Sequence, residues 1–176
     1  ATNGRFISLD PIGFDSGDEN FYRYVANNSV NLFDSLGLAG EQSNKTPGQK
    51  IIDSVNELGN FSTKDGPEKG NKACAFAVNK VIKNAGLNPV GKNPKYVPSV
   101  EADLKSGRGE KIKQSEAKAG DLAISSNTGH IGICLNDGCT KIRSNSSSKA
   151  QFKWDSNDNF DGYYGKGNTR FYRLKN

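Results

Sequence analysis

The chain has 176 residues, of which 34% are hydrophobic and 20 are glycine, so it fits one domain with an appendage or two small units. No run approaches the roughly 18–20 apolar residues of a membrane-spanning helix, and the start does not resemble a signal peptide. Three Cys and one His exclude a Cys/His zinc site of ordinary ligand count, and we expect neither a metal nor a cofactor.

The net charge of +5 is unevenly distributed along the chain. Residues 1–38 carry two basic and five acidic side chains, a net charge of −3, so the remainder carries +8. A basic body favours an anionic partner such as nucleic acid, a cell-wall polymer or an acidic protein. The simpler interpretation is a solvated surface that keeps the protein in solution.

Residues 1–38 contain two short aromatic and β-branched runs separated by Gly, Asp and Asn clusters, a pattern typical of short strands joined by turns. Two Asp-x-x-Gly units, at 10–13 and 34–37, would on local chemistry alone be turn repeats.

Three segments, GRFISLDPIG at 4–13, NFYRYVANNSVN at 20–31 and DSLGL at 34–38, resemble the end of the core domain of Rhs (YD-repeat) polymorphic toxins. In that family a β-shell surrounds a variable C-terminal toxin, which aspartyl-type self-cleavage releases. The resemblance implies that Asp10 and Asp34 are the paired carboxylates and that the cut falls between Leu38 and Ala39. Ser35 stands where the family usually has Pro.

Residues 39–70 have the composition of a linker. Within them, Ile51, Ile52, Val55 and Leu58 recur at helical spacing, which predicts one short amphipathic helix. We therefore divide the chain into 1–38, a linker with a short helix at 39–70, and a C-terminal domain at 71–176.

The stretch 72–86 predicts the central helix of this C-terminal domain. Its apolar residues fall on one face, its Lys and Asn residues on the other, and Gly86 stands where a helix would end. Cys74 lies in the first turn, where unpaired N–H groups and the helix dipole favour an anion. We therefore expect its thiolate to form more readily than that of a free cysteine.

The segment 112–124 predicts a turn that leads into a buried strand, and 129–135 and 139–145 predict a second and a third strand, with Asn136-Asp137-Gly138 as a hairpin turn. A helix followed by such a meander indicates an α+β fold. Cys134 and Cys139 flank the turn and form either a disulfide or two free thiols. We expect the later aromatic residues to form a closing strand and the walls of a site; they are Trp154, Phe160, Tyr163, Tyr164, Phe171 and Tyr172.

Three sequence motifs of the C-terminal domain carry a resemblance: KACAFAV at 72–78, AGDLA at 119–123 and GHIGICLNDG at 129–138. Through them the domain resembles papain-like peptidoglycan amidases of the NlpC and CHAP types, above all the cell-wall amidase effectors of type VI secretion. The resemblance implies a papain-like helix packed on a small antiparallel sheet. It also implies that Cys74 is the nucleophile, that His130 is the general base and acid, and that the N–H of Cys74 helps to hold the oxyanion.

A third polar residue is needed to orient the imidazole of such a pair. On the next predicted strand Asn145 is the first choice, because its amide oxygen accepts from a ring N–H, and Ser144 is the second. Arg143 only donates and would repel an imidazolium.

The resulting hypothesis is a secreted antibacterial effector that hydrolyses amide bonds in peptidoglycan peptide stems in the periplasm of a target cell. Its partners would be peptidoglycan, an acidic immunity protein and the rest of the Rhs shell, without nucleic acid. One alternative is a papain-like protease, deamidase or acyltransferase acting on a cytosolic protein. Others are a nuclease toxin, which the single His disfavours, and a binding module in which Cys74 only packs.

Overall fold

A computed structural model describes residues 45–125, 129–156, 160–161 and 169–175. The chain divides into two compact units, Ala1–Lys45 and Thr46–Asn176, and the second unit holds nearly all of the described residues. The predicted self-cleavage residues Asp10, Asp34, Leu38 and Ala39 lie outside the described residues, as do Tyr163 and Tyr164.

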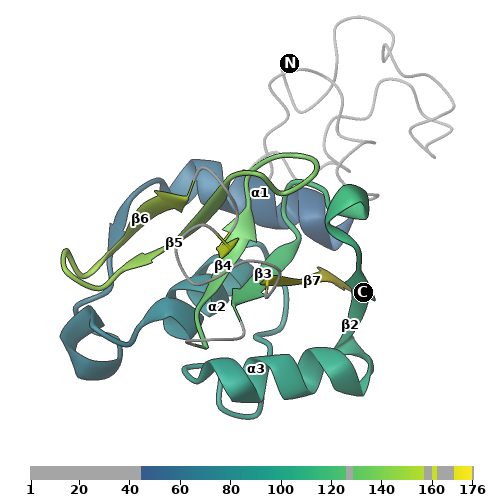
Figure 1. Ribbon diagram of the computed structural model, residues 1–176. Helices are drawn as coiled ribbons and strands as arrows, with labels where there is room; N and C mark the ends of the chain where they lie inside the picture. Colours follow the sequence, from purple (N-terminus) through teal and green to yellow (C-terminus); the bar gives the residue numbers. More distant parts are fainter. Residues whose placement is uncertain (1–44, 126–128, 157–159, 162–168, 176) are drawn as a thin grey trace, which may run out of the picture. The chain divides into compact units, whose positions relative to one another are not determined.

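A seven-stranded antiparallel sheet forms the centre of the second unit (Figure 1). Its strand order is β1-β6-β5-β4-β3-β7-β2, so β3, β4, β5 and β6 form a meander and β7 returns to pair with β3. With the helices described below, this arrangement confirms the predicted α+β class. The strands are β1 (Phe61–Ser62), β2 (Gly109–Ile112), β3 (Leu122–Ser125), β4 (Ile131–Cys134), β5 (Ile142–Ser146), β6 (Gln151–Ser156) and β7 (Thr169–Leu174).

Three α-helices occur in the described part of the chain: α1 (Pro47–Leu58), α2 (Cys74–Asn84) and α3 (Val97–Asp103). A π turn, η5 (Leu104–Arg108), continues α3, and two short 3₁₀ turns are η4 (Pro67–Gly70) and η6 (Gln114–Glu116). The helix predicted at 72–86 is confirmed, and Gly86 follows it with a positive φ of 73°. None of the described helices is long and apolar enough to span a membrane.

Two apolar clusters lie on opposite faces of the sheet, because successive residues of a strand point to opposite sides. Leu122 and Ile124 of β3 belong to the first cluster, whereas Ala123 between them belongs to the second. The first cluster holds the buried faces of α1 and α2, including Ile51 and Val78. The second is smaller and contains Ala117, Cys134, Cys139, Ile142, Phe160 and Phe171, with Trp154 against it.

Residues 46–70, which the sequence assigned to a linker, are part of the compact unit. Ile51 and Val55 of α1 are fully buried or nearly so, and Phe61 of β1 stacks on Phe152 of β6. Thr46 and Gln49 form a capping box at the start of α1, which fixes where that helix begins. The domain boundary therefore lies near residue 46 rather than residue 71.

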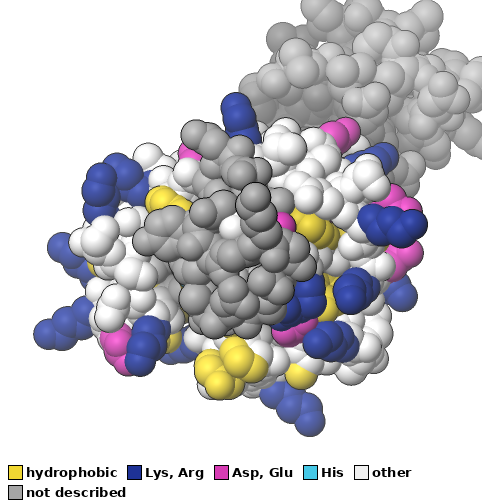
Figure 2. Space-filling model, viewed as in Figure 1, with side chains coloured by type: hydrophobic (Ala, Val, Ile, Leu, Met, Phe, Trp, Pro, Cys, Tyr) yellow, Lys and Arg dark blue, Asp and Glu magenta, His cyan; other side chains and the backbone are white. Residues whose placement is uncertain are grey.

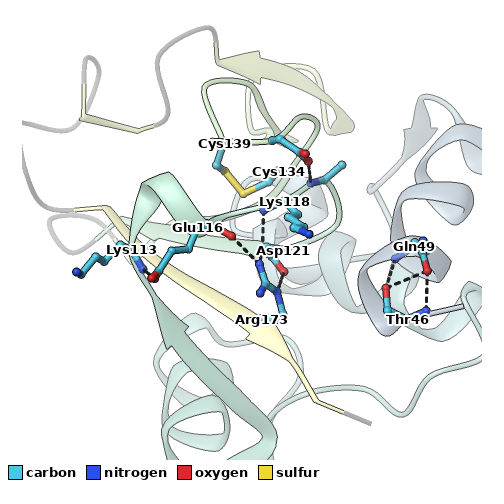
Figure 3. A network of polar contacts seen from close by, with 11 residues as sticks. Thr46, Gln49, Lys113, Glu116, Lys118, Asp121, Cys134, Cys139 and Arg173 are labelled. Atoms are coloured by element: carbon cyan, nitrogen blue, oxygen red, sulfur yellow. Dashed lines mark hydrogen bonds and ion pairs between the residues drawn. A yellow bond between two sulfur atoms is a disulfide. The ribbon is translucent and has the colours of Figure 1, made fainter.

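A polar network ties the turn before β3 to the last strand (Figure 3). Asp121 is only 2% exposed, accepts from the N–H of Lys118 and pairs with Arg173 of β7 at 2.8 Å. Gly120, with φ of 90°, lies so close to the backbone of Gly48 that a Cβ there would clash with it. The turn thus fixes β3 and β7 in place and brings the start of α1 against them.

Cys134 and Cys139 are joined by a disulfide that closes the hairpin turn, and both residues are fully buried. We predict that Cys134→Ala/Cys139→Ala destabilises the protein by about 2 kcal/mol, the chain-entropy value for so short a loop. Denaturant unfolding measures this difference. Reductant should lower the free energy of unfolding of the wild type by the same amount and should leave that of the double variant unchanged. A double variant as stable as the oxidised wild type would contradict the prediction.

A second network joins α3 to β7. Glu101 of α3 accepts a bidentate hydrogen bond from Arg170 at 2.6 and 2.8 Å, a bond from the Tyr172 hydroxyl at 2.8 Å, and an ion pair from Lys105. Although partial burial raises the pKa of Glu101, these donors outweigh it and lower the pKa to about 2 from 4.5. The ionised carboxylate therefore stabilises the folded state.

Because the folded pKa of Glu101 lies below its unfolded value, its contribution is complete above about pH 4.5 and is lost as the pH falls towards 2. We expect Glu101→Gln to lower the free energy of unfolding by roughly 1–3 kcal/mol at pH 7. The difference from wild type should vanish near pH 2 in urea titrations. Glu68→Gln, which breaks the exposed Glu68–Lys72 pair, is the control and should leave stability unchanged.

Candidate functional site

The loop that leads into α2 is held by β5 and by the turn that follows it. Asn145 of β5 is 2% exposed; its Oδ1 accepts from the Thr63 hydroxyl at 2.6 Å and its Nδ2 donates to the Gly70 carbonyl at 2.7 Å. Farther along, Ser147 donates to the carbonyl of Asn71 at 2.7 Å. These contacts join segments about 75 residues apart and determine where α2 begins.

Cys74 is the first residue of α2 and is the free cysteine of this unit. Its thiol is partly buried beside the first cluster. Backbone N–H groups of Ile131, of Ala75 and of Cys74 itself lie close enough to the sulfur to lower the pKa of the thiol. The sulfur therefore lies at the start of β4, one residue along the chain from His130.

Burial raises the pKa of the Cys74 thiol above its ordinary value of 9.0, and this effect exceeds the lowering by the three N–H donors. The expectation that the helix start would give a low-pKa thiolate is therefore wrong for this structure. The donors stabilise a thiolate once it forms, but at neutral pH the resting group is the protonated thiol.

His130 immediately precedes β4 and is partly buried. Its Nε2 lies 2.9 Å from the Ser144 hydroxyl of β5. Two rings meet it edge-on, Trp154 at 5.7 Å and Phe160 at 5.3 Å between centroids, and these two rings stack on each other. Burial lowers the pKa of His130 to about 4 from 6.5, so the imidazole is neutral at pH 7.

Cys74 and His130 thus approach the start of β4 from different sides. The thiol reaches the backbone N–H of Ile131, while the imidazole is directed to Ser144 and the aromatic pair. When Nε2–H donates to Ser144, Nδ1 is the unprotonated nitrogen.

Of the two residues considered for orienting the imidazole, the structure places Ser144, the second choice, against the ring. The amide of Asn145 is committed to Thr63 and Gly70 instead. The reason is strand alternation: Ser144 pairs with Gly132 and faces the second cluster, and the next residue faces the other way. Arg143 pairs with Asp155 on β6 at 2.7 Å.

The sequence did not reveal two further features of this site. One is the backbone N–H of Ile131, which leaves no signature in a side-chain pattern. The other is Ser125, which is 1% exposed and whose hydroxyl has no hydrogen-bond partner among the described residues. Its own N–H donates to the carbonyl of His130, so this buried hydroxyl lies on the strand beside the histidine.

The described part of the chain contains no group of three or more His, Cys, Asp or Glu residues able to hold a metal ion. The chemistry available from the residues themselves is that of a thiol, a neutral imidazole and a hydroxyl, set against backbone N–H donors. No protein-family model matches the chain, and no curated protein sequence matches it significantly.

Because both groups are neutral at rest, we predict that alkylation of Cys74 by iodoacetamide accelerates steadily with pH up to and beyond pH 9. A preformed thiolate–imidazolium pair would instead give a rate plateau between about pH 5 and 8. Stopped-time alkylation followed by intact-mass spectrometry distinguishes the two profiles. Cys74→Ala, which leaves the disulfide-bonded cysteines, is the blank, and a neutral-pH plateau would contradict the prediction.

Proposed function

We propose that this protein is a papain-like cysteine amidase that hydrolyses peptide-stem amide bonds of peptidoglycan, as the toxic tip of an Rhs-type antibacterial effector. The observation that carries the proposal is the position of the Cys74 sulfur at the first turn of α2, against the N–H of the residue that follows His130. This chemistry needs a nucleophile and a base within hydrogen-bond reach of each other, and the proposal assigns these roles to the thiol at the start of α2 and the imidazole that immediately precedes β4.

In the proposed reaction His130 Nδ1 removes the thiol proton as the sulfur of Cys74 attacks the stem carbonyl and forms the S–C bond. The carbonyl oxygen becomes an oxyanion, which the N–H of Cys74 stabilises. The C–N bond then breaks, and the imidazolium returns its proton to the leaving amine. Water, deprotonated by the same imidazole, hydrolyses the thioester and releases a carboxylic acid and the thiol.

Ser144 acts in this scheme as a positioning residue. Its hydroxyl lies 2.9 Å from Nε2 and, by accepting from Nε2–H, would leave Nδ1 as the basic nitrogen. Trp154 and Phe160 pack edge-on against the imidazole and reduce the access of water to this hydrogen bond, which strengthens it. The neutral imidazole supported by these contacts is the form that accepts a proton.

The basic charge of the chain outside residues 1–38 supports an anionic polymer as substrate. The buried disulfide supports action in an oxidising compartment such as the periplasm. The alternatives with the same chemistry, a protease or deamidase acting on a cytosolic protein, differ in the substrate alone.

The test is digestion of purified sacculi with the 176-residue chain, followed by mass spectrometry of the released muropeptides. We expect Cys74→Ala to abolish release and His130→Ala to reduce it by roughly 10²–10⁴-fold. Ser144→Ala should lower kcat about tenfold with little change in KM and should alter the pH profile, because only the imidazole tautomer is affected.

Asn145→Ala is the matched structural control for Ser144→Ala. It removes the tie to Thr63 and Gly70, so its loss of activity should be accompanied by a lower Tm, whereas Ser144→Ala should retain most of its Tm. Intact muropeptides after digestion by a folded wild-type protein would reject the substrate. Full activity of Cys74→Ala would reject the mechanism.

A further inference from the structure

A concave site lies on the outer face of α2, apart from the thiol. A hollow of about 370 Å³ is lined by the Phe76 ring, by two prolines and by lysines of α2 and of the following loop. The lining residues are Phe76, Asn79, Lys80, Lys83, Pro89, Pro94 and Lys95. All of the charged side chains among them are lysines, so the site is apolar at its base and positive at its rim.

The hollow is rigid, because the loop that forms one wall is anchored. Asn79 is buried, and its amide donates to the carbonyls of Val90 and Pro94 and accepts from the N–H of Val90. The N–H of Gly91 donates to Asp103 at 2.7 Å. A wall already held in this way loses little conformational entropy when a ligand binds.

The same hydrogen bonds decide what kind of ligand suits the hollow. Since the amide of Asn79 is committed to the loop, the surface of the hollow below the lysine ammonium groups is mainly a Phe ring, proline rings and lysine stems. A sugar or a nucleobase would bury polar groups there without partners. An apolar side chain would bury only apolar surface.

The lysines at the rim of the hollow favour a ligand that carries negative charge beside its apolar group. The side chains of Lys80, Lys83 and Lys95 are exposed, and the ammonium groups of Lys80 and Lys95 lie over the rings of Phe61 and Phe76 at 4.7 and 5.9 Å. Tyr96, next to Lys95, is 58% exposed and adds apolar surface beside the hollow. Lys and Arg side chains also project around the outline of the face in view in Figure 2.

We infer that this hollow, defined by Phe76, Pro89 and Pro94 and rimmed by the three lysines, is a docking site for an acidic protein segment that inserts one aromatic or aliphatic side chain. Carboxylates flanking the inserted side chain pair with the lysines. The site is distinct from the Cys74 chemistry, so it stands whether or not the protein cleaves peptidoglycan.

Fluorescence anisotropy with the 176-residue chain and a labelled peptide, one tryptophan flanked by two glutamates on each side, tests this inference. We expect the wild-type protein to bind this peptide with a Kd below about 1 mM. Lys83→Glu/Lys95→Glu should raise the Kd at least tenfold, whereas Lys111→Glu should leave it within twofold of the wild-type value. Lys111 is an exposed lysine on β2, and its reversal controls for a charge change away from the hollow, about half that of the double variant. Phe76→Leu should weaken the tryptophan peptide several-fold but not a peptide with serine in its place.

Four results would overturn the inference. The first is no binding of the tryptophan peptide by folded wild type at 1 mM, and the second is equal weakening by Lys111→Glu and by Lys83→Glu/Lys95→Glu. The third is equal affinity for the tryptophan peptide and the serine peptide. The fourth is tighter binding of a single-stranded oligonucleotide, which Lys83→Glu/Lys95→Glu abolishes. The last result would assign the site to nucleic acid. Circular dichroism of each variant establishes that loss of binding is not loss of fold.

Discussion

The buried amide of Asn145 is the contact on which the candidate site depends. It satisfies one donor and one acceptor on a loop that lies about 75 residues earlier in the chain, and an unsatisfied amide at that depth would cost roughly 1–3 kcal/mol. The position of this loop is further restricted at Gly70, which has a φ of 96° and packs so closely on Ala150 that a Cβ would clash. The start of α2, and with it Cys74, is therefore placed by β5.

Burial, rather than the helix dipole, controls the electrostatics of the site. The first turn of α2 supplies the N–H groups expected of it, yet desolvation raises the pKa of Cys74 and lowers that of His130. A dipole contributes about 0.3–1 kcal/mol at an exposed site, whereas burial can shift a pKa by several units. A thiol kept protonated at rest is also less readily oxidised, which suits a free cysteine in a protein that carries a disulfide.

Local features were predictable from the sequence, and features set by tertiary contacts were not. The helix of Cys74, the strands on either side of His130 and the turn at 136–138 follow from periodicity and turn chemistry. The choice between Ser144 and Asn145 depends on which face each residue takes, and a register shift falls between these two residues where β5 pairs with β6. The pKa of Cys74 and the inclusion of α1 in the domain depend on burial, which composition does not reveal.

Helix α2 carries three separate tasks on three parts of its surface. Val78, Val81 and Ile82 bury one face in the core, while the first turn presents the thiol to the start of β4. Phe76 lies two residues beyond Cys74, about 200° around the helix axis, so its ring and the lysines that follow face away from the sulfur. A partner seated on that outer face would bind to the same rigid helix without covering the thiol. Recognition at this surface and chemistry at the helix start are therefore physically separable, although one helix positions both.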